Sequence, residues 1–236
     1  MTISVFDLFR IGIGPSSSHT VGPMRAARRF LQRCAQSAPL TDIARVRVHL
    51  YGSLAATGVG HGTISAVVLG LAGAEPQTVD PDEIGGMLSA IESAHTLHLL
   101  GEVAVSFDAD TDVVMHPEES LPGHPNGMRF EAFGHDDALV CEHRYYSVGG
   151  GFVVDDSELN TEIDSPVAVP HPYRSADQLL VICEQTGVPI SQVVRANELA
   201  QRTDDEITSG LAAIRSAMHD CVDRGCRNEG ELPGGL

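Results

Sequence analysis

The sequence predicts an α+β protein, with an N-terminal α/β sandwich domain followed by the first helices of an incomplete all-α domain. Between residues 45 and 148, segments with the apolar–polar alternation of strands are interspersed with helical segments. Residues 156–174 contain three prolines and several acidic residues, which indicates a linker. The pattern after the linker is helical. We therefore assign the two domains to residues 1–155 and 175–236.

Each element of the first domain follows from its periodicity. The segment MRAARRFLQRCAQ predicts a helix, RVRVHLYG (45–52) a strand, and the apolar segment TISAVVLGLAG (63–73) a buried helix. Residues 81–97 predict an amphipathic helix with acidic residues in its first turn. Four further strands are expected over EVAVSFD, TDVVMHP, GMRFEAFG and ALVCEHRYYSV. A mostly antiparallel sheet flanked by helices would result.

Three helices are predicted in the second domain. The first covers residues 175–187, with Ser175 as its N-cap and Gly187 as its end, and the second covers 189–202, with Pro189 in its first turn. The third, over residues 204–230, begins with acidic and ends with basic residues, as the helix dipole prefers. Helices of this number and length bury their apolar faces poorly. We expect this region to be the truncated start of a larger helical domain.

Composition restricts the partners of the chain. Its 236 residues include 15 Lys and Arg against 32 Asp and Glu, and the net charge is −17. Nucleic acid and anionic membranes are therefore not expected as partners, because phosphate binding needs clustered cations. Five scattered cysteines predict no disulfide framework, and neither a targeting segment nor a span of transmembrane length is visible. These features predict a cytoplasmic protein, in which any anion site must be local.

The segment GPSSSHTVGPM (14–24) is the first candidate site. Gly14 and Pro15 indicate a turn, and Pro23 suits the first turn of the following helix. The hydroxyl groups between them could cap backbone N–H groups or donate hydrogen bonds to a carboxylate; they belong to Ser16, Ser17, Ser18 and Thr20. A capping loop without a ligand is the alternative, although one cap needs only one hydroxyl group.

The segment GVGHGT (58–63) is the second candidate site. Glycines on both sides leave the imidazole of His61 unshielded before the buried helix. Histidine is a good general base because its ordinary pKa is close to neutral. A histidine in a simple turn is the alternative.

Two further segments carry weaker signals. In PGHPNGM (122–128), His124 and Asn126 belong to a segment whose Asn-Gly pair is typical of a hairpin turn, and that reading is favoured when the segment is taken alone. Three glycines end YYSVGGG (145–151), which indicates a bulge or a close backbone approach and matches no dinucleotide-binding motif. Cys221 and Cys226 match neither zinc nor ferredoxin spacing.

Together these segments resemble one family across residues 1–236. GIGPSSSHTVGPM, YGSLAATGVGHGT, HPNGM, YYSVGGGF and DCVDRGCRNEGELPGGL are similar to segments of the single-chain, iron–sulfur-dependent L-serine dehydratases, or L-serine ammonia-lyases. The resemblance implies conversion of L-serine to pyruvate and ammonia with a [4Fe–4S] cluster and without pyridoxal phosphate. An open iron site would act as a Lewis acid on the substrate hydroxyl while a base removes the α-proton.

The resemblance also implies roles for individual residues. His61 would be the catalytic base, and His19 would contact the substrate or orient its loop. His124 and Asn126 would make substrate or interface contacts. The carboxylate of L-serine would accept hydrogen bonds from Ser16, Ser17, Ser18 and Thr20.

This chain departs from the family in its length. Members are about twice as long, and their cluster-binding cysteines lie beyond the point that corresponds to Leu236. The resemblance therefore implies no metal ligand within this chain and a cluster domain supplied in cis or in trans. It also implies a homodimer. A fragment that binds serine or another carboxylate without chemistry, or a regulatory module of that kind, is the alternative function.

Overall fold

A computed structural model describes residues 4–159 and 167–230 of the chain. They form two compact units, one over residues 12–159 and the other over residues 4–11 and 167–230. Residues 4–11 therefore belong with the helical part of the chain, whereas the sequence pattern assigned them to the first domain. Residues 160–166 of the predicted linker and residues 231–236 lie outside the described residues.

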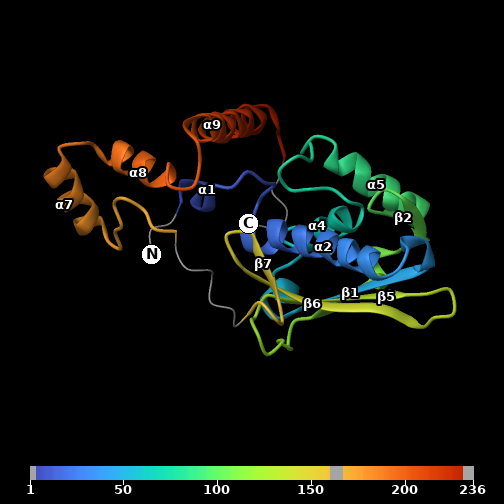
Figure 1. Cartoon of the computed structure of the whole chain (residues 1–236). Helices are drawn as coiled ribbons and strands as arrows, with labels where there is room; N and C mark the ends of the chain where they lie inside the picture. Colours follow the sequence, from blue (N-terminus) through green and yellow to red (C-terminus); the bar gives the residue numbers. More distant parts are fainter. Residues whose placement is uncertain (1–3, 160–166, 231–236) are drawn as a thin grey trace. The chain divides into compact units, whose positions relative to one another are not determined.

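A five-stranded sheet forms the base of the α/β unit, in the order β4-β1-β5-β6-β7 (Figure 1). Strand β4 pairs with β1 in parallel, and the remaining pairs are antiparallel. Val48 lies opposite both Val113 and Phe130, and this register gathers apolar side chains on one face. The bounds are β1 (Arg45–Tyr51), β4 (Val113–His116), β5 (Gly127–Phe133), β6 (Leu139–Gly149) and β7 (Phe152–Asp155).

Two sequence predictions are corrected by a small hairpin. The predicted strand EVAVSFD does not join the main sheet; as β3 (Val103–Ser106) it pairs with β2 (Thr96–Leu99). Leu100 and Gly101 both have positive φ, which allows the tight turn between these strands. The helix predicted over 81–97 is shorter, because α5 (Ile84–Ala94) ends where His95 adopts a left-handed conformation.

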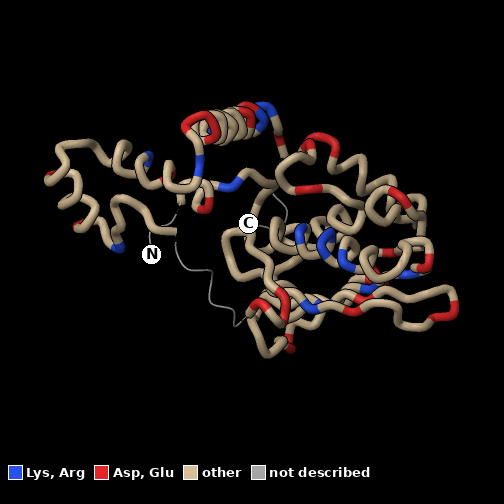
Figure 2. Tube along the Cα trace, in the orientation of Figure 1, with Lys and Arg blue, Asp and Glu red and all other residues tan. Residues whose placement is uncertain are grey.

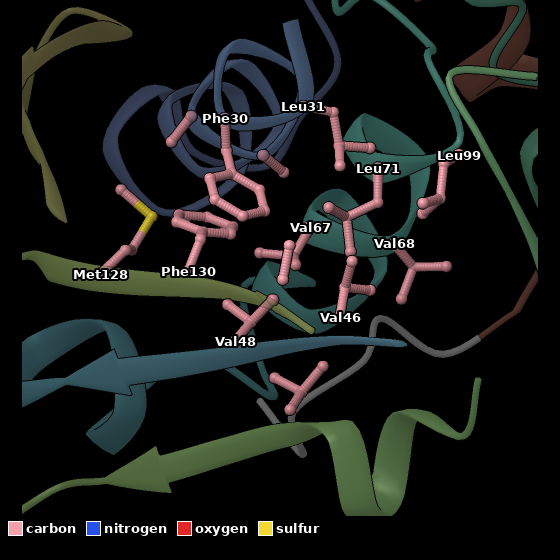
Figure 3. Packing of buried hydrophobic residues seen from close by; sticks show 14 of the residues in the cluster. Phe30, Leu31, Val46, Val48, Val67, Val68, Leu71, Leu99, Met128 and Phe130 are labelled. Carbon is pink, nitrogen blue, oxygen red and sulfur yellow. The ribbon is translucent and has the colours of Figure 1, made fainter. Parts of the chain in front are cut away.

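The core of this unit lies between one face of the sheet and two helices, α2 (Gly22–Ser37) and α4 (Thr63–Leu71) (Figures 1 and 3). Phe30 of α2 stacks on Phe130 of β5 with 5.3 Å between the ring centroids. Figure 3 shows Val67 of α4 between the strands and α2. Four short helical segments connect these elements, namely α3 (Gly52–Ala56), α6 (Ala109–Asp112), η1 (Ser17–Val21) and η2 (Leu40–Asp42).

Helices α2 and α4 approach each other closely at Gly70. A Cβ atom at this position would lie 2.2 Å from the carbonyl oxygen of Met24 and 2.9 Å from the Cβ of Ala27. Real Cβ contacts are not this short, so the two helices pack at this distance only because Gly70 has no side chain. Gly70 thus sets the spacing of the two helices.

The polar face of α2 contacts the β7 edge of the sheet. Arg25 Nη1 donates to the carbonyl oxygen of Gly151 at 2.8 Å, and Arg29 Nη1 donates to that of Val153 at 3.2 Å. Figure 2 shows the basic residues along this helix. At the end of β7, burial raises the pKa of Asp155, but hydrogen bonds from Ser157 and Arg33 outweigh it and bring the pKa to about 2. An ionised Asp155 therefore joins α2 to β7.

The helical unit contains α1 (Val5–Leu8), α7 (Ala176–Thr186), α8 (Ile190–Glu198) and α9 (Asp204–Arg227). Ser175 and Gly187 bound α7 as predicted, whereas Pro189 is the N-cap of α8 rather than a residue of its first turn. The buried carboxylate of Glu198 holds the N-terminal segment, since it accepts hydrogen bonds from the backbone N–H of Val5 and the hydroxyl of Ser4.

One face of α9 leaves apolar side chains in solvent. Leu211, Met218 and Val222 are 40%, 60% and 62% exposed, and their spacing puts them on one side of the helix. Ile207 is the one fully buried residue among the described residues of α9. This face is free to pack against another apolar surface.

The contact at Gly70 predicts opposite effects for two glycine substitutions. Gly70→Ala should lower the free energy of unfolding by about 1–3 kcal/mol, because the new methyl group forces α2 and α4 apart. Gly86→Ala is the matched control in α5, where an added Cβ meets no atom within 4 Å. It should raise stability by about 0.5–1 kcal/mol through helix propensity alone. Urea unfolding measures both values, and equal effects would contradict the close helix contact.

Candidate active site

The polar segment 16–20 forms the entrance of helix α2. Ser17–Val21 is a π-helical turn, η1, that continues directly into α2, so this run is helical instead of a separate loop before the helix. Ser16 is its N-cap: the Ser16 Oγ accepts a hydrogen bond from the His19 N–H at 3.2 Å. Pro23 lies in the first turn of α2, as predicted.

Among the serines of this turn, Ser17 is the one available to a ligand. It is exposed, and its hydroxyl has no hydrogen-bond partner within the part of the chain that the structure describes. Ser18 Oγ lies 2.9 Å from His19 Nδ1 and 3.4 Å from Ser16 Oγ, so these hydroxyls already have partners. The backbone N–H groups at the start of a helix have no intrahelical acceptor and add further donors there.

His61 lies on the glycine-rich loop directly before α4. Its Nδ1 is 2.9 Å from the carbonyl oxygen of Thr57. A carbonyl only accepts, so Nδ1 carries the proton of the neutral ring and Nε2 keeps a free lone pair. This is the arrangement that a general base needs.

The imidazoles of His19 and His61 form a pair. Their ring centroids are 4.9 Å apart. The Nε2 of His19 is also 3.0 Å from the Oγ of Ser53, at the start of α3. Burial lowers the pKa of His19, and the nearby His61 lowers it further, while a hydrogen bond with Ser53 acts in the opposite direction. His19 therefore favours its neutral form.

Two buried threonines join the loops that carry these histidines. Thr20 Oγ1 donates to the carbonyl oxygen of His61 at 2.8 Å, and Thr63 Oγ1 donates to that of His19 at 2.7 Å. Because a hydroxyl group has one proton, the bond made by Thr20 leaves it none for a substrate carboxylate. The structure thus places Thr20 among the groups that support the site.

His124 and Asn126 lie on a neighbouring turn. The backbone N–H of Asn126 donates to His124 Nδ1 at 3.1 Å, and its side-chain amide donates to the Ser147 carbonyl at 3.1 Å. The turn reaches the site through Pro125, whose carbonyl accepts the Ser53 N–H at 3.2 Å. Within the described residues, no hydrogen bond joins His124 to His19 or His61.

The glycine-rich end of β6 packs against η1 and the start of α2. The predicted bulge is confirmed, because the register between β6 and β7 shifts between Ser147 and Gly149. The predicted close approach is also confirmed. A Cβ on Gly151 would lie 2.9 Å from Val21 Cγ1, and one on Gly22 would lie 2.1 Å from Ser147 Oγ. The glycine-rich end of β6 and the loop of His61 therefore both contact η1 or the start of α2.

Helices α2 and α4 both begin at this site. Helix α2 follows η1, and α4 starts two residues after His61. Helix N-termini present free N–H groups and the positive end of the helix dipole. A small anion is thereby favoured at this point, in spite of the net charge of −17.

The described residues do not fit a metal centre. No three His, Cys, Asp or Glu side chains among residues 4–159 and 167–230 converge in a way that could hold an ion. Cys34 is buried and the other cysteines are dispersed over β6, α7 and α9, all as free thiols. In the same residues, no helix has the length and apolar character needed to span a membrane.

Four residues of the site were not singled out from the sequence. Ser53, Thr57 and Thr63 lie in the segment YGSLAATGVGHGT, and Ser147 lies in YYSVGGG, so the segments were recognised but these side chains were not. Hydroxyl residues beside a candidate histidine are a usable signal. Thr63 donates to the carbonyl of His19, and the hydroxyl of Ser53 contacts the His19 ring; periodicity cannot locate such contacts between distant segments.

The fold is that of an α+β domain, and its candidate site combines a helix entrance with a histidine pair. The chain belongs to the serine dehydratase beta chain family, whose profile matches residues 4–158. It is 50% identical to an L-serine dehydratase of Streptomyces coelicolor and 45% identical to one of Mycobacterium tuberculosis, in both cases over the whole chain. L-serine dehydratase 1 of Escherichia coli is 43% identical over 99% of the chain. The resemblance noted in the sequence is thus confirmed.

The chain spans about half the length of the curated relatives that it matches. The alignments cover 52% of the Streptomyces coelicolor protein and 51% of the two others. About half of each of these relatives therefore has no counterpart in residues 1–236.

The contact between Gly22 and Ser147 predicts a specific rescue. Gly22→Ala should lower the free energy of unfolding by about 1–3 kcal/mol, because the new methyl group overlaps with the Ser147 side chain. Ser147→Gly removes the obstructing atoms and should restore part of the loss in the double variant. Urea unfolding of the two single variants and the double variant checks this. Additive losses would show that the two positions do not touch.

Proposed function

We propose that this chain is the first half of an iron–sulfur-dependent L-serine dehydratase, which converts L-serine to pyruvate and ammonia. The observation that carries the proposal is the proximity of two functions in one site: a histidine with a free Nε2, and a helix entrance with a free hydroxyl at Ser17. The names of the relatives supply the substrate. A cytoplasmic location and a homodimer remain part of this proposal.

The helix entrance would bind the carboxylate of L-serine. The hydroxyl of Ser17 and the first N–H groups of η1 are donors without intrahelical acceptors, and the dipole of the helix adds to their attraction. Ser16 and Ser18 shape this turn through their hydrogen bonds with His19. His124 and Asn126 would border the site through the contact between Pro125 and Ser53.

His61 would remove the α-proton of the bound substrate. Its Nε2 accepts this proton, and the electrons of the broken C–H bond form a double bond to the β-carbon as hydroxide leaves. The product of this step is aminoacrylate, which tautomerises to an imine. Addition of water to the imine releases ammonia and pyruvate.

The second half of the protein would supply what this chain lacks. The described residues do not fit a [4Fe–4S] cluster, so we place the cluster and its ligands in that half, in cis or in trans. The exposed apolar face of α9 supports such a partner, since packing a helical domain on it would bury Leu211, Met218 and Val222. No pyridoxal phosphate is required.

Replacement of His61 tests the assignment of the base. In an enzyme completed by the second half of a relative, His61→Ala should lower kcat by roughly 10²-fold or more, the usual size of a general-base effect. KM should change less, because the base acts on the transition state. His61→Gln should not restore turnover, since an amide accepts no proton. The fall in pyruvate formation at low pH, which protonation of the base causes, should also be absent from the variant. If kcat and this fall at low pH are both unchanged, another residue is the base.

Replacement of Ser17 tests the carboxylate site. Ser17→Ala removes one donor to a charged group and should weaken serine binding by about 2 kcal/mol, with little effect on kcat. Steady-state kinetics would show this as a higher KM. Ser89→Ala, an exposed serine of α5 outside the site, is the matched control and should leave KM unchanged. Tight serine binding by the completed protein without any turnover would instead favour a regulatory module.

A further inference from the structure

Two reciprocal hydrogen bonds connect η1, which carries His19, with the loop of His61 and the start of α4. Thr20 follows His19 and donates to the carbonyl of His61, while Thr63 follows His61 by two residues and donates to the carbonyl of His19. Each loop therefore supplies one donor and one acceptor. Thr20 is 3% exposed and Thr63 is fully buried, so water does not compete for either bond.

We propose that Thr20 and Thr63 are positioning residues that hold His19 and His61 as a pair and thereby fix the Nε2 of His61 relative to the Ser17 end of η1. This inference rests on the proposed function, because it takes His61 as the base. The two threonines are called the threonine clamp below. They act through the backbone of the histidines and do not touch the substrate.

The proposed reaction needs such a clamp because its two parts come from different loops. The carboxylate site belongs to the entrance of α2, and the base belongs to the loop before α4. Bound at its carboxylate, L-serine presents its α-proton at a fixed distance from η1. A displacement of the base by about 1 Å can cost up to roughly 10²-fold in rate. The clamp joins the loops at the backbone of both histidines.

The state of His19 reports on the clamp without any catalysis. Its ring faces His61 at 4.9 Å and is bonded to Ser18 and Ser53, and no described carboxylate forms an ion pair with either ring. The depressed pKa of His19 thus depends on burial and on His61. If the loops separate, both effects weaken and the pKa of His19 must rise.

The experiment follows His19 by NMR titration of the full 236-residue chain. Thr63→Val removes the hydroxyl and nearly keeps the shape of the side chain, so the pKa of His19 should rise toward the ordinary histidine value of about 6.5. Thr63→Ser keeps the hydroxyl and should titrate like the wild type. Thr111→Val is the matched control, because it removes another threonine hydroxyl that donates to a backbone carbonyl. It should have no effect.

A double-variant cycle tests whether the two threonines act as one unit. Thr20→Val should raise the pKa of His19 as Thr63→Val does, and the double variant should add little to either. The inference is overturned if Thr63→Val titrates like the wild type, or if Thr63→Ser shifts the pKa as much as Thr63→Val. The second result would assign the effect to packing. If Thr63→Val does not fold, Thr20→Val and Thr20→Ser replace it. The inference then requires that Thr20→Val raises the pKa of His19 and that Thr20→Ser does not.

Kinetics of the completed enzyme separate this inference from the proposed function. Thr63→Val should lower kcat by roughly tenfold or more with little change in KM, and Thr63→Ser should restore kcat. If the completed wild-type enzyme is inactive but the variants show the expected pKa shifts of His19, the threonine clamp is supported and the proposed dehydratase activity is contradicted. Full activity of Thr63→Val, with the shift present, would show that the pair does not position the base.

Discussion

The close packing of α2 on α4 is the constraint on which the rest of the α/β unit depends. Gly70 lets the backbones approach, and the apolar faces of both helices then cover the same face of the sheet. Because each helix begins at the candidate site, their spacing also sets the distance between η1 and the loop of His61. Core packing and site geometry therefore depend on the same two helices. A substitution buried between these helices would also change the positions of the two histidines.

The sequence predicted which segments are helices and strands better than it predicted which segments they contact. The strands 45–51 and 127–133 and the helices after residue 175 follow from periodicity and capping residues, which act locally. The hairpin of β2 and β3 was missed because a left-handed residue at His95 interrupts a helical pattern that extends further. The candidate residues His19 and His61 were found as motifs. Their pairing and the buried bonds of Thr20 and Thr63 depend on tertiary contacts, which one sequence does not reveal.

The proposed carboxylate site lies in an acidic chain. With a net charge of −17, the overall field of the chain opposes the approach of a carboxylate. The four arginines on the polar face of α2 already have partners. Arg25 and Arg29 donate to backbone carbonyls, and Arg28 and Arg33 form ion pairs with Glu75 and Asp155. In the proposed function, the attraction at η1 would come from the helix dipole and from free N–H groups, which act over a few ångströms. Such a site would favour small anions over extended polyanions, which would meet the negative field of the chain.

The arginines at the edge of the sheet have a consequence for association. Strand β7 ends the sheet, and a terminal strand normally offers its carbonyl groups to any extended chain that arrives. Arg25 and Arg29 donate hydrogen bonds to the carbonyls of Gly151 and Val153. An incoming strand would have to displace two guanidinium groups that are anchored on a packed helix. Two carbonyl groups beside this edge are therefore already hydrogen-bonded, which makes β7 a poor template for the addition of a further strand.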